Sequence, residues 1–451
     1  MKNVITESPL QMPLPSTNLP KRYFKRMVLQ PTSLCNLNCS YCYLAERTSN
    51  HRMPIEVAQS IANEFRSLET PITIIWHGGE PLATGLSHFE KLLKTFNGTK
   101  VRHAIQTNAT LINDKWCHLF KKYSVSIGIS IDGQGKLNSN RVDFSGKETI
   151  SKVENGIALL RKHDIDFGII AVVNNTNIDN ATSIYEYAIK LGAHSLAINI
   201  EEIDGVNTRI VPDDVSVTKF WKELWTAWSE TPTIRIREFE HISYWISSTL
   251  SSNTPSKEYR VDLFPTISWN GDVVFLSPEL HSLKHNEFNN FIAGNVLHTP
   301  LFDLMKEISP KNSSYVLQYL EGVEMCKNTC AYFQYCRGGH ASNKYAEHRK
   351  LNVTETISCR NSRKRLVNAI LDNEIEPRNY LELNSLIDVG ITKKAQLKSL
   401  ISSKSKKLEL SGLGAEYDKF SDWDKWDDFD RINFSEYDDD GNQTGIEIGG
   451  H

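Results

Sequence analysis

Short apolar runs alternate with longer amphipathic segments between about residue 25 and residue 201. The apolar runs are rich in β-branched residues, which is typical of buried strands. These predicted strands lie at residues 26–31, 72–76, 101–108, 125–133, 167–173 and 195–201. The intervening segments repeat apolar side chains every three or four positions, which predicts helices at residues 54–69, 111–123, 148–163 and 183–192.

The alternation of strands and helices implies a parallel sheet with right-handed crossovers. Six strands at this spacing suit a partial (β/α)6 barrel, similar to a TIM barrel, better than a closed barrel of eight strands. In such folds the catalytic side chains lie at the C-terminal ends of the strands. The pattern therefore predicts an α/β protein whose chemistry lies in the loops that follow the strands.

The rest of the chain differs in character. Residues 205–260 are helical and rich in aromatic residues. Residues 261–375 carry several cysteines and open with the hairpin pattern PTISWNGDVVFLS, in which Asn270-Gly271 is a strong turn signal. A basic helical segment then leads to the flexible joint SGLG. We expect three parts, which are a barrel at residues 1–245, a smaller cysteine-bearing domain at 246–375, and a C-terminal segment with a tail at 376–451.

The tail has an aromatic residue at every third position: Tyr417, Phe420, Trp423, Trp426 and Phe429. An α-helix advances about 100° per residue, so these aromatics would spread over roughly 240° of its surface. A strand would alternate them between its two faces. No regular element favours this period, and two interpretations remain. The tail is an acidic interaction segment, or the tripeptide aromatic-x-polar is itself a chemical unit.

Charge is distributed unevenly along the chain. The net charge is −3, but the last 41 residues hold 12 of the 54 acidic and only 3 of the 51 basic side chains. A mildly basic body with an acidic tail favours docking of the tail on its own body. Residues 1–21 lack the apolar core of a signal peptide, and no stretch has the roughly 18 apolar residues of a membrane span. We expect a cytoplasmic protein with no membrane or nucleic-acid partner, whose eight cysteines serve as metal ligands or catalysts rather than disulfides.

Three cysteines directly follow the first predicted strand. Cys35, Cys39 and Cys42 have the spacing Cys-x3-Cys-x2-Cys in CNLNCSYC. Three thiolates this close can bind three irons of a [4Fe–4S] cluster and leave the fourth iron open. Zinc is the alternative, although a structural zinc ion needs four ligands and only three are local.

This spacing, with Tyr41 just before the third cysteine, resembles the radical SAM superfamily. WHGGEPL, after the next strand, resembles the Gly-Gly-Glu-Pro motif by which that superfamily binds the methionine amino group of S-adenosylmethionine (SAM). Gly78 and Gly79 permit close backbone approach, and Glu80 offers acceptors to an ammonium group. The alternative is a plain glycine turn before a helix. The resemblance implies a SAM-binding [4Fe–4S] cluster that generates a 5′-deoxyadenosyl radical, so the chain is expected to be a radical SAM oxidoreductase.

Further residues resemble positions that line the SAM site in peptide-modifying members of this superfamily. They lie at strand ends or in the following loops, where each could also be structural: Gln106, Asn108, Ser130 and Arg141. The resemblance implies that Arg141 pairs with the SAM carboxylate. It covers roughly residues 25–245.

A second cysteine group lies near the end of the smaller domain and comprises Cys326, Cys330, Cys336 and Cys359. Its pattern, CKNTCAYFQYC with a downstream SCR, resembles the SPASM-type domain that holds auxiliary iron–sulfur clusters. The hairpin region, PTISWNGDVVFLS, resembles the corresponding region of that family but lacks its cysteines. We therefore expect one auxiliary [4Fe–4S] cluster with four cysteine ligands, and a four-cysteine zinc site is the alternative.

CAYFQYCRGG and NIEEIDG resemble, more narrowly, the maturases that form three-residue cyclophanes in ribosomal peptides. Such enzymes join an aromatic ring carbon to the β-carbon two residues later. The resemblance implies that Glu201 or Glu202, after the sixth strand, acts as the base that rearomatises the ring or orients the peptide. It also implies an electron donor such as flavodoxin or ferredoxin.

The tail then becomes the predicted substrate, attached to its own enzyme behind a leader-like segment. Its candidate crosslink residues are Tyr417, Phe420, Trp423, Lys425, Trp426, Asp428, Phe429 and Arg431. Two alternatives remain. One is another SPASM maturase, either thioether-forming or formylglycine-forming, although a tail without cysteine cannot form thioethers in cis. The other is a metal-binding scaffold with an interaction tail.

Overall fold

A computed structural model describes residues 24–251 and 263–372. The predicted crosslink residues of the tail therefore lie outside the described residues. The barrel strands are β1 (Arg26–Leu29), β2 (Ile72–Trp76), β3 (Val101–Thr107), β4 (Ser126–Ser130), β5 (Phe167–Val173) and β6 (Ser195–Ile200). Consecutive strands pair in parallel and in chain order, which confirms the predicted partial barrel.

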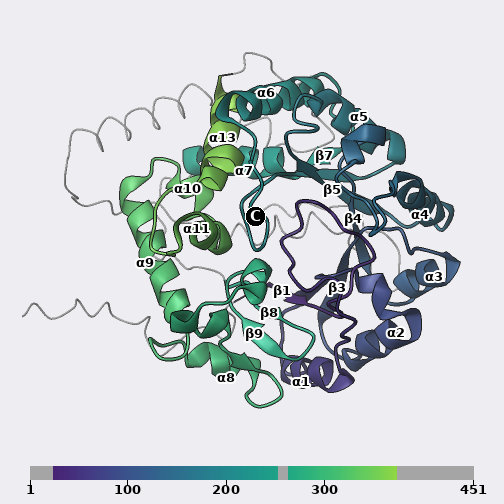
Figure 1. The fold of residues 1–451 in the computed structure, drawn as a ribbon, viewed down its shortest axis with the longest axis vertical. Helices are drawn as coiled ribbons and strands as arrows, with labels where there is room; N and C mark the ends of the chain where they lie inside the picture. The colour runs from purple at the N-terminus through teal and green to yellow at the C-terminus, as the bar shows by residue number, and fades with distance from the viewer. Residues whose placement is uncertain (1–23, 252–262, 373–451) are drawn as a thin grey trace, which may run out of the picture.

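Helices follow the strands and form an outer arc around them (Figure 1). They are α1 (Ile55–Phe65), α2 (Leu86–Thr95), α3 (Asp114–Lys122), α4 (Ile150–Lys162), α5 (Ala181–Leu191) and α6 (Asp214–Glu230). Three of them, α1, α3 and α4, lie within the segments predicted as helices, and α5 begins two residues before the segment predicted at 183–192. The sequence prediction did not include α2, although its buried Phe89, Leu92 and Leu93 have helical spacing.

Alternate residues of the central strands pack against these helices. In β5, Phe167, Ile169, Ala171 and Val173 are buried in the helix-facing core, whereas the residues between them are only half-buried. β2 and β4 show the same alternation. The face turned away from the helices is therefore less tightly packed, and it points into the barrel.

The sheet extends beyond the six predicted strands and has ten in the order β10-β9-β8-β1-β2-β3-β4-β5-β6-β7. The four additional strands are β7 (Arg235–Ile236), β8 (Thr266–Ile267), β9 (Asp272–Val274) and β10 (Gly294–Asn295). β8 and β9 form the predicted hairpin, with Gly271 at its turn in a left-handed conformation of φ +91°. β8 also pairs in parallel with β1, a contact that the sequence pattern did not predict.

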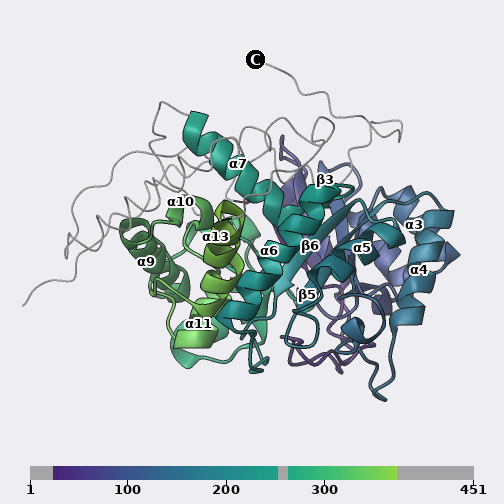
Figure 2. The same cartoon turned by 90° about the horizontal axis from the view of Figure 1, so that it is seen from above.

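The C-terminal helices close the ring that the barrel helices leave open (Figure 1). They are α7 (Arg237–Ser251), α8 (Leu301–Lys306), α9 (Ser314–Thr329), α10 (Phe333–Cys336), α11 (Ala341–His348), α12 (Ile357–Cys359) and α13 (Arg365–Leu371). Figure 2 shows α13 beside α6, where the buried Trp221 donates an indole hydrogen bond to the Asn361 carbonyl at 2.9 Å. Because α7 crosses residues 245 and 246 and β8 joins the barrel sheet, the two predicted domains share one sheet.

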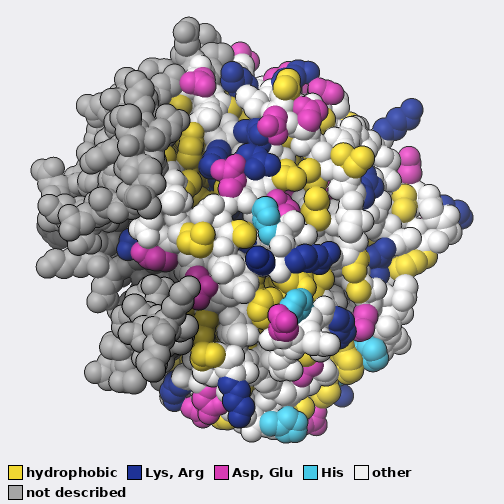
Figure 3. All heavy atoms as spheres, turned by 60° about the vertical axis from the view of Figure 1, so that its left-hand side comes forward, with side chains coloured by type: hydrophobic (Ala, Val, Ile, Leu, Met, Phe, Trp, Pro, Cys, Tyr) yellow, Lys and Arg dark blue, Asp and Glu magenta, His cyan; other side chains and the backbone are white. Residues whose placement is uncertain are grey.

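The face drawn in Figure 3 has basic, acidic and apolar side chains interspersed. Among the described helices, none combines the length and the apolar character that crossing a bilayer requires.

Candidate active site

The first cysteine group lies on the loop that follows β1, as predicted. The Cys35 N–H donates to the Arg47 carbonyl at 2.8 Å, and the Cys42 N–H donates to the Cys39 carbonyl at 3.2 Å. Burial raises the pKa of the Cys35 thiol to about 12 and that of Cys39 to about 11, and the charge of Arg141 opposes the shift at Cys39. Buried sulfurs that resist ionisation need a bound cation to become thiolates, and iron ions meet that need.

The Gly-Gly-Glu segment packs directly against this loop. Gly78 and Gly79 have φ values of +93° and +65°, and a Cβ on Gly79 would lie 2.5 to 2.9 Å from three carbonyl oxygens of residues 32–34. The Glu80 N–H donates to the Leu34 carbonyl at 2.7 Å. The two glycines are therefore required for the close approach between the β2 loop and the cysteine loop.

The Glu80 side chain connects neighbouring strand ends. Its Oε1 accepts hydrogen bonds from the Leu82 N–H at 3.0 Å and the Thr107 hydroxyl at 2.6 Å, and its Oε2 accepts one from the Asn108 N–H at 2.8 Å. Burial raises the pKa of Glu80, and these hydrogen bonds oppose the shift. Glu80 and Asn108 were both predicted as cofactor contacts, and the structure brings them together.

Two other predicted residues meet at Asp132, which is fully buried after β4. The Tyr41 hydroxyl donates to Asp132 Oδ2 at 2.5 Å, and Arg141 Nε pairs with Asp132 Oδ1 at 3.0 Å. Arg141 also lies over the Tyr41 ring, 5.5 Å from its centroid. Asp132 therefore holds the residue before the third cysteine in place. Ser130 was predicted as a cofactor contact, whereas no role was predicted for Asp132.

Gln106 and Ser130 are joined on the barrel-facing side of neighbouring strands, where Gln106 Nε2 donates to Ser130 Oγ at 2.8 Å. Gly128, paired with Gln106 across the strands, leaves the space that the Gln106 side chain fills. Two predicted cofactor contacts are thus adjacent and point away from the helix-packed core.

The two predicted base candidates have different surroundings. Glu201 is 4% exposed, and its Oε1 pairs with Arg209 Nε at 3.0 Å and accepts from Asn207 Nδ2 at 3.2 Å. Burial raises the pKa of Glu201, and the charge of Arg209 opposes the shift. Arg209 also donates to Ser40 in the cysteine loop, so Glu201 helps to hold that loop.

Glu202 links the barrel to the cysteine-bearing domain. Its Oε2 accepts from Asn343 Nδ2 at 2.7 Å, and its Oε1 accepts from the Ser358 hydroxyl at 2.7 Å. Ser358 directly precedes Cys359. Both carboxylate oxygens are therefore engaged by the second domain, which favours a positioning role for this residue.

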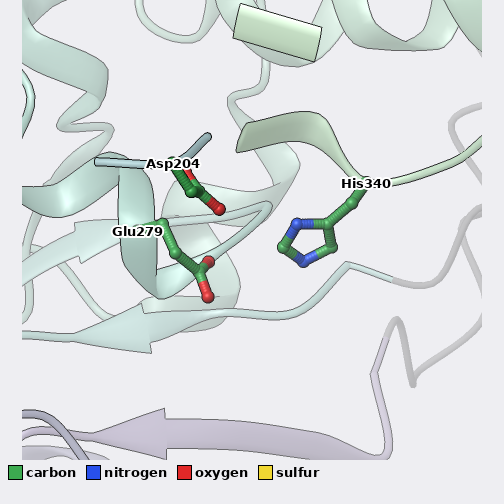
Figure 4. A group of neighbouring side chains, drawn as sticks. All are labelled: Asp204, Glu279 and His340. Atoms are coloured by element: carbon green, nitrogen blue, oxygen red, sulfur yellow. The ribbon is translucent and has the colours of Figure 1, made fainter. Parts of the chain in front are cut away.

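Asp204, Glu279 and His340 form a cluster that the sequence prediction missed. They come from the loop after β6, from the short 3-10 helix Pro278–Ser282 and from the residue before α11, and they point toward one another in Figure 4. One ligand atom from each lies within 4.8 Å of the others. Asp204 Oδ2 accepts from the Ser342 hydroxyl at 2.7 Å, and that hydroxyl also lies 2.8 Å from His340 Nδ1.

The charge of the half-buried Glu279 acts on the buried Asp204. Burial raises the pKa of Asp204 well above its usual range, and the neighbouring charge of Glu279 raises it further. The surroundings of Asp204 therefore favour its protonated form. Asp204, Glu279 and His340 lie far apart in the chain, in NIEEIDG, SPEL and RGGH, so no local spacing connects them.

The carboxylate cluster lies beside the first cysteine group. Gly205, at φ +52°, brings its loop against the Tyr43 backbone, and the Val206 N–H donates to the Tyr43 carbonyl at 3.1 Å. Burial raises the pKa of the Tyr43 hydroxyl, and the charges of Glu279, Cys42 and Asp204 add to the shift. That hydroxyl lies 3.0 Å from His77 Nε2, whose pKa burial lowers. These directions favour a neutral Tyr43–His77 pair beside the cluster.

The structure places all four cysteines of the second group around one cavity, as predicted. Cys326 and Cys330 lie at the C-terminal end of α9, Cys336 ends α10, and Cys359 ends α12. The pKa of Cys336 is lowered to about 6, mainly by a hydrogen bond from the Cys359 thiol, whose own pKa is raised. Burial raises the pKa of Cys326 to about 11, against the charge of Lys344. The four sulfurs offer a closed set of ligands.

Comparisons with known proteins agree with this arrangement. Residues 29–188 match the Radical SAM superfamily. The Synechocystis sp. (strain ATCC 27184 / PCC 6803 / Kazusa) protein sll1766 is 32% identical over 357 residues, which are 74% of this chain and 88% of that protein. The cysteine-type anaerobic sulfatase-maturating enzyme of Clostridium perfringens (strain 13 / Type A) is 27% identical over 337 residues, which are 69% of this chain and 88% of the enzyme.

Solved structures share the fold. Native anSMEcpe with bound AdoMet and Cp18Cys peptide has a TM-score of 0.61 at 23% identity and covers 81% of this chain and 99% of its own. Streptococcus suis SuiB bound to precursor peptide SuiA has a TM-score of 0.53 at 16% identity, covering 75% of this chain and 76% of its own. The chain belongs to the radical SAM superfamily and is an enzyme of that class. It is homologous to anaerobic sulfatase-maturating enzymes.

Proposed function

We propose that this enzyme forms carbon–carbon crosslinks, as three-residue cyclophanes, in a ribosomal peptide that is its own tail. The observation that carries this proposal is the aromatic residue at every third position from Tyr417 to Phe429. Period three matches no helix or strand but is the spacing that consecutive three-residue rings require. The peptide-bound relatives, anSMEcpe and SuiB, support a peptide as the substrate class.

Cys35, Cys39 and Cys42 would hold a [4Fe–4S] cluster, and SAM would bind its open iron. The three cysteines of the first group would leave one iron open, and the four cysteines of the second group would ligate every iron of an auxiliary cluster.

The predicted SAM contacts keep that role in the proposal. Glu80 Oε2 accepts one hydrogen bond in the structure, so it has a lone pair for the SAM ammonium group. Arg141 uses its Nε for Asp132, which leaves the outer guanidinium nitrogens for the SAM carboxylate. Gly78, Gly79 and Tyr41 would shape the site by holding the cysteine loop.

When bound, the cluster and SAM supply a 5′-deoxyadenosyl radical that takes a hydrogen atom from the β-carbon of the third residue of a motif. The peptide carbon then bonds to the aromatic ring two residues earlier, and the ring loses one proton and one electron. Each event thus converts SAM to methionine and 5′-deoxyadenosine and removes two hydrogens from the peptide. The electron that cleaves SAM comes from an external donor such as flavodoxin or ferredoxin, and the second cysteine group would hold the cluster that accepts the leaving electron.

The proton acceptor that the geometry supports best is Glu279. It lies beside Asp204, whose pKa is raised by burial and by the charge of Glu279, so that Asp204 favours its protonated form. The Ser342 hydroxyl connects Asp204 to the exposed His340, which offers a path for the proton toward solvent. Glu201 and Glu202 hold the cysteine loop and the second domain, so we assign them positioning roles.

The second candidate function is formation of formylglycine, which the 26% identity to a serine-type anaerobic sulfatase-maturating enzyme favours. Oxidation of a serine to formylglycine also removes two hydrogens, and the tail contains Ser421 and Ser435. Loss of mass alone therefore does not distinguish the two reactions. Formylglycine is an aldehyde and reacts with hydroxylamine, whereas a cyclophane does not.

The experiment is anaerobic turnover of the reconstituted full chain with SAM and a reductant, followed by proteolysis and mass spectrometry of the tail. We expect a loss of about 2 Da per ring, equal amounts of 5′-deoxyadenosine, and no adduct with hydroxylamine. Trp423→Ala should remove one crosslink and leave those of the other motifs. Ser421→Ala, the matched control in the neighbouring motif, should leave the Trp423 crosslink in place. A hydroxylamine adduct that Ser421→Ala abolishes would establish the formylglycine reaction instead.

The attachment of the tail is tested in the same experiment. A covalently linked substrate has an effective concentration near millimolar, so a separately added tail peptide should compete poorly. If the attached tail leaves turnover unmodified while the added peptide is crosslinked, the tail is a docking segment and not the substrate.

A further inference from the structure

A single lysine is enclosed with the second cysteine group. Lys344 lies on α11, is 1% exposed and lines the cavity formed by the four cysteines. Its ammonium nitrogen is 4.0 Å from the Cys326 sulfur. A buried ammonium group is costly unless it meets a negative charge or a hydrogen-bond acceptor. No carboxylate pairs with it among the described residues, and the charges that act on its ammonium group are those of Cys326, Cys336 and Cys359, which oppose the lowering of its pKa by burial.

The surroundings of Lys344 are shaped to hold this cation. The ammonium lies over the Tyr319 ring, 5.3 Å from its centroid, and the Tyr319 hydroxyl donates to the Gly339 carbonyl at 2.7 Å. Gly322 on α9 leaves the space in which the ammonium sits, because a Cβ there would lie 2.9 Å from the Lys344 nitrogen. The Tyr319 ring, Gly322 and the Cys326 thiol therefore hold the Lys344 ammonium group at one position beside the cysteines.

We propose that Lys344 raises the reduction potential of the auxiliary cluster and so makes that cluster an electron acceptor. The inference rests on the proposed function, which places a [4Fe–4S] cluster on these four cysteines. Four thiolates and a [4Fe–4S] core carry a net charge that becomes more negative by one on reduction. A fixed positive charge in a low-dielectric site stabilises the reduced state more than the oxidised state, which favours transfer of the electron released by the aromatic ring.

The other nearby cations are held differently. Lys364 pairs with Glu355, and its side chain is 25% exposed, so an opposite charge and solvent offset its field. Arg363 lies over the Tyr335 ring, 5.8 Å from its centroid, on the Cys336 side of the group. Lys364 is therefore the matched control for Lys344, since both are lysines beside the same cysteines and only one is enclosed without a carboxylate.

The test is a redox titration of the reconstituted full chain, followed by electron paramagnetic resonance, with Cys35, Cys39 and Cys42 replaced by Ala so that only the second site contributes. We expect Lys344→Met to lower the reduction equilibrium constant at least tenfold, which corresponds to 59 mV for one electron. Lys364→Met should change it much less. Equal shifts in the two variants, or no shift for Lys344→Met with a full cluster, would overturn the proposal.

Iron and sulfide analysis separates this inference from the proposed function. A parent protein that binds no second cluster contradicts the proposed function, whereas a bound cluster with an unchanged potential contradicts only the role of Lys344. If the Met variant does not assemble the auxiliary cluster, Lys344→Gln and Lys344→Arg test the same point. The Gln variant should lower the reduction potential of the cluster, and the Arg variant should have a potential close to that of the parent. Loss of the cluster from both neutral variants but not from Arg would overturn the tuning role, because the charge would then serve assembly.

Discussion

The two cysteine groups are built in opposite ways. The first lies on the loop after β1, which backbone contacts hold in place, including the approach of Gly79 to three carbonyl oxygens. The nearby cation Arg141 is paired with Asp132. The second is enclosed by α9, α10 and α12 around a cavity, with four sulfurs and an ammonium that no carboxylate of the described residues neutralises. The two groups therefore differ in the number of cysteines and also in whether the nearby cation is paired with a carboxylate.

This contrast indicates how a single chain separates two tasks. In the proposed function, three ligands would leave one iron open for SAM near the polar strand ends at Glu80 and Ser130. Four ligands at the second group would leave no open iron, so an auxiliary cluster there would exchange only electrons. The Asp204–Glu279 pair lies between the two parts of the chain, where a peptide proton and electron would leave together.

The largest effect is expected from removing the first group. Replacing Cys35, Cys39 and Cys42 with Ala should reduce SAM cleavage to the uncatalysed background and lower the iron content from about eight to about four per chain, because only the closed site remains. Cys117→Ala is the matched control, since Cys117 is buried in α3 away from both groups and should leave eight irons. SAM cleavage that persists in the triple variant would break the comparison, because the open site would then lie elsewhere.

A smaller effect is expected from Glu279→Gln, which keeps the shape of the side chain but removes its basicity. Crosslinking should fall roughly 10²- to 10⁴-fold, the usual contribution of a general base, while 5′-deoxyadenosine continues to form. Product analysis by mass spectrometry and quantification of 5′-deoxyadenosine measure the two separately. Glu287→Gln, at an exposed position in the next 3-10 helix, Asn286–Phe291, is the control and should change neither. An equal loss of SAM cleavage and crosslinking would place Glu279 in the open site rather than between the two sites.

The smallest effect is expected from Asp204→Asn and concerns stability. The pKa of Asp204 in the folded protein is raised above its usual value of 3.8, so between these two values the folded state holds a proton that the unfolded state has released. Stability that depends on this group is present at low pH and is lost as the pH rises, by about 1.4 kcal/mol per pH unit within that interval. The Asn variant does not titrate.

The measurement is anaerobic thermal unfolding of the reconstituted protein between pH 5 and pH 8. The Tm of Asp204→Asn relative to the parent should increase with pH. Asp179→Asn, whose parent side chain is exposed, should show no such trend. A difference in Tm that stays constant with pH would mean that Asp204 ionises normally and that the carboxylate pair carries two charges.

The alternation of strands and helices, the hairpin at Asn270-Gly271 and both cysteine groups could be predicted from short stretches of sequence. Each depends on residues within one element or one loop, and local spacing decides strand, turn and ligand patterns. The pairs Gln106–Ser130 and Glu80–Asn108 followed almost as directly, because parallel strands bring their C-terminal ends to one edge.

Only the tertiary structure decided which polar groups are engaged and which are enclosed. Glu201 and Glu202 resemble each other in the sequence, yet one pairs with Arg209 and the other is held by Asn343 and Ser358. Asp204, Glu279 and His340 meet because the hairpin joins β1 and α11 packs against the loop after β6. Such contacts join residues that lie far apart in the sequence, and they depend on sheet register and on how the C-terminal helices pack. No local sequence pattern records either of these. The burial of Lys344 beside four thiols has the same origin. A sequence shows that a side chain is charged, but it does not show whether that side chain is exposed to solvent.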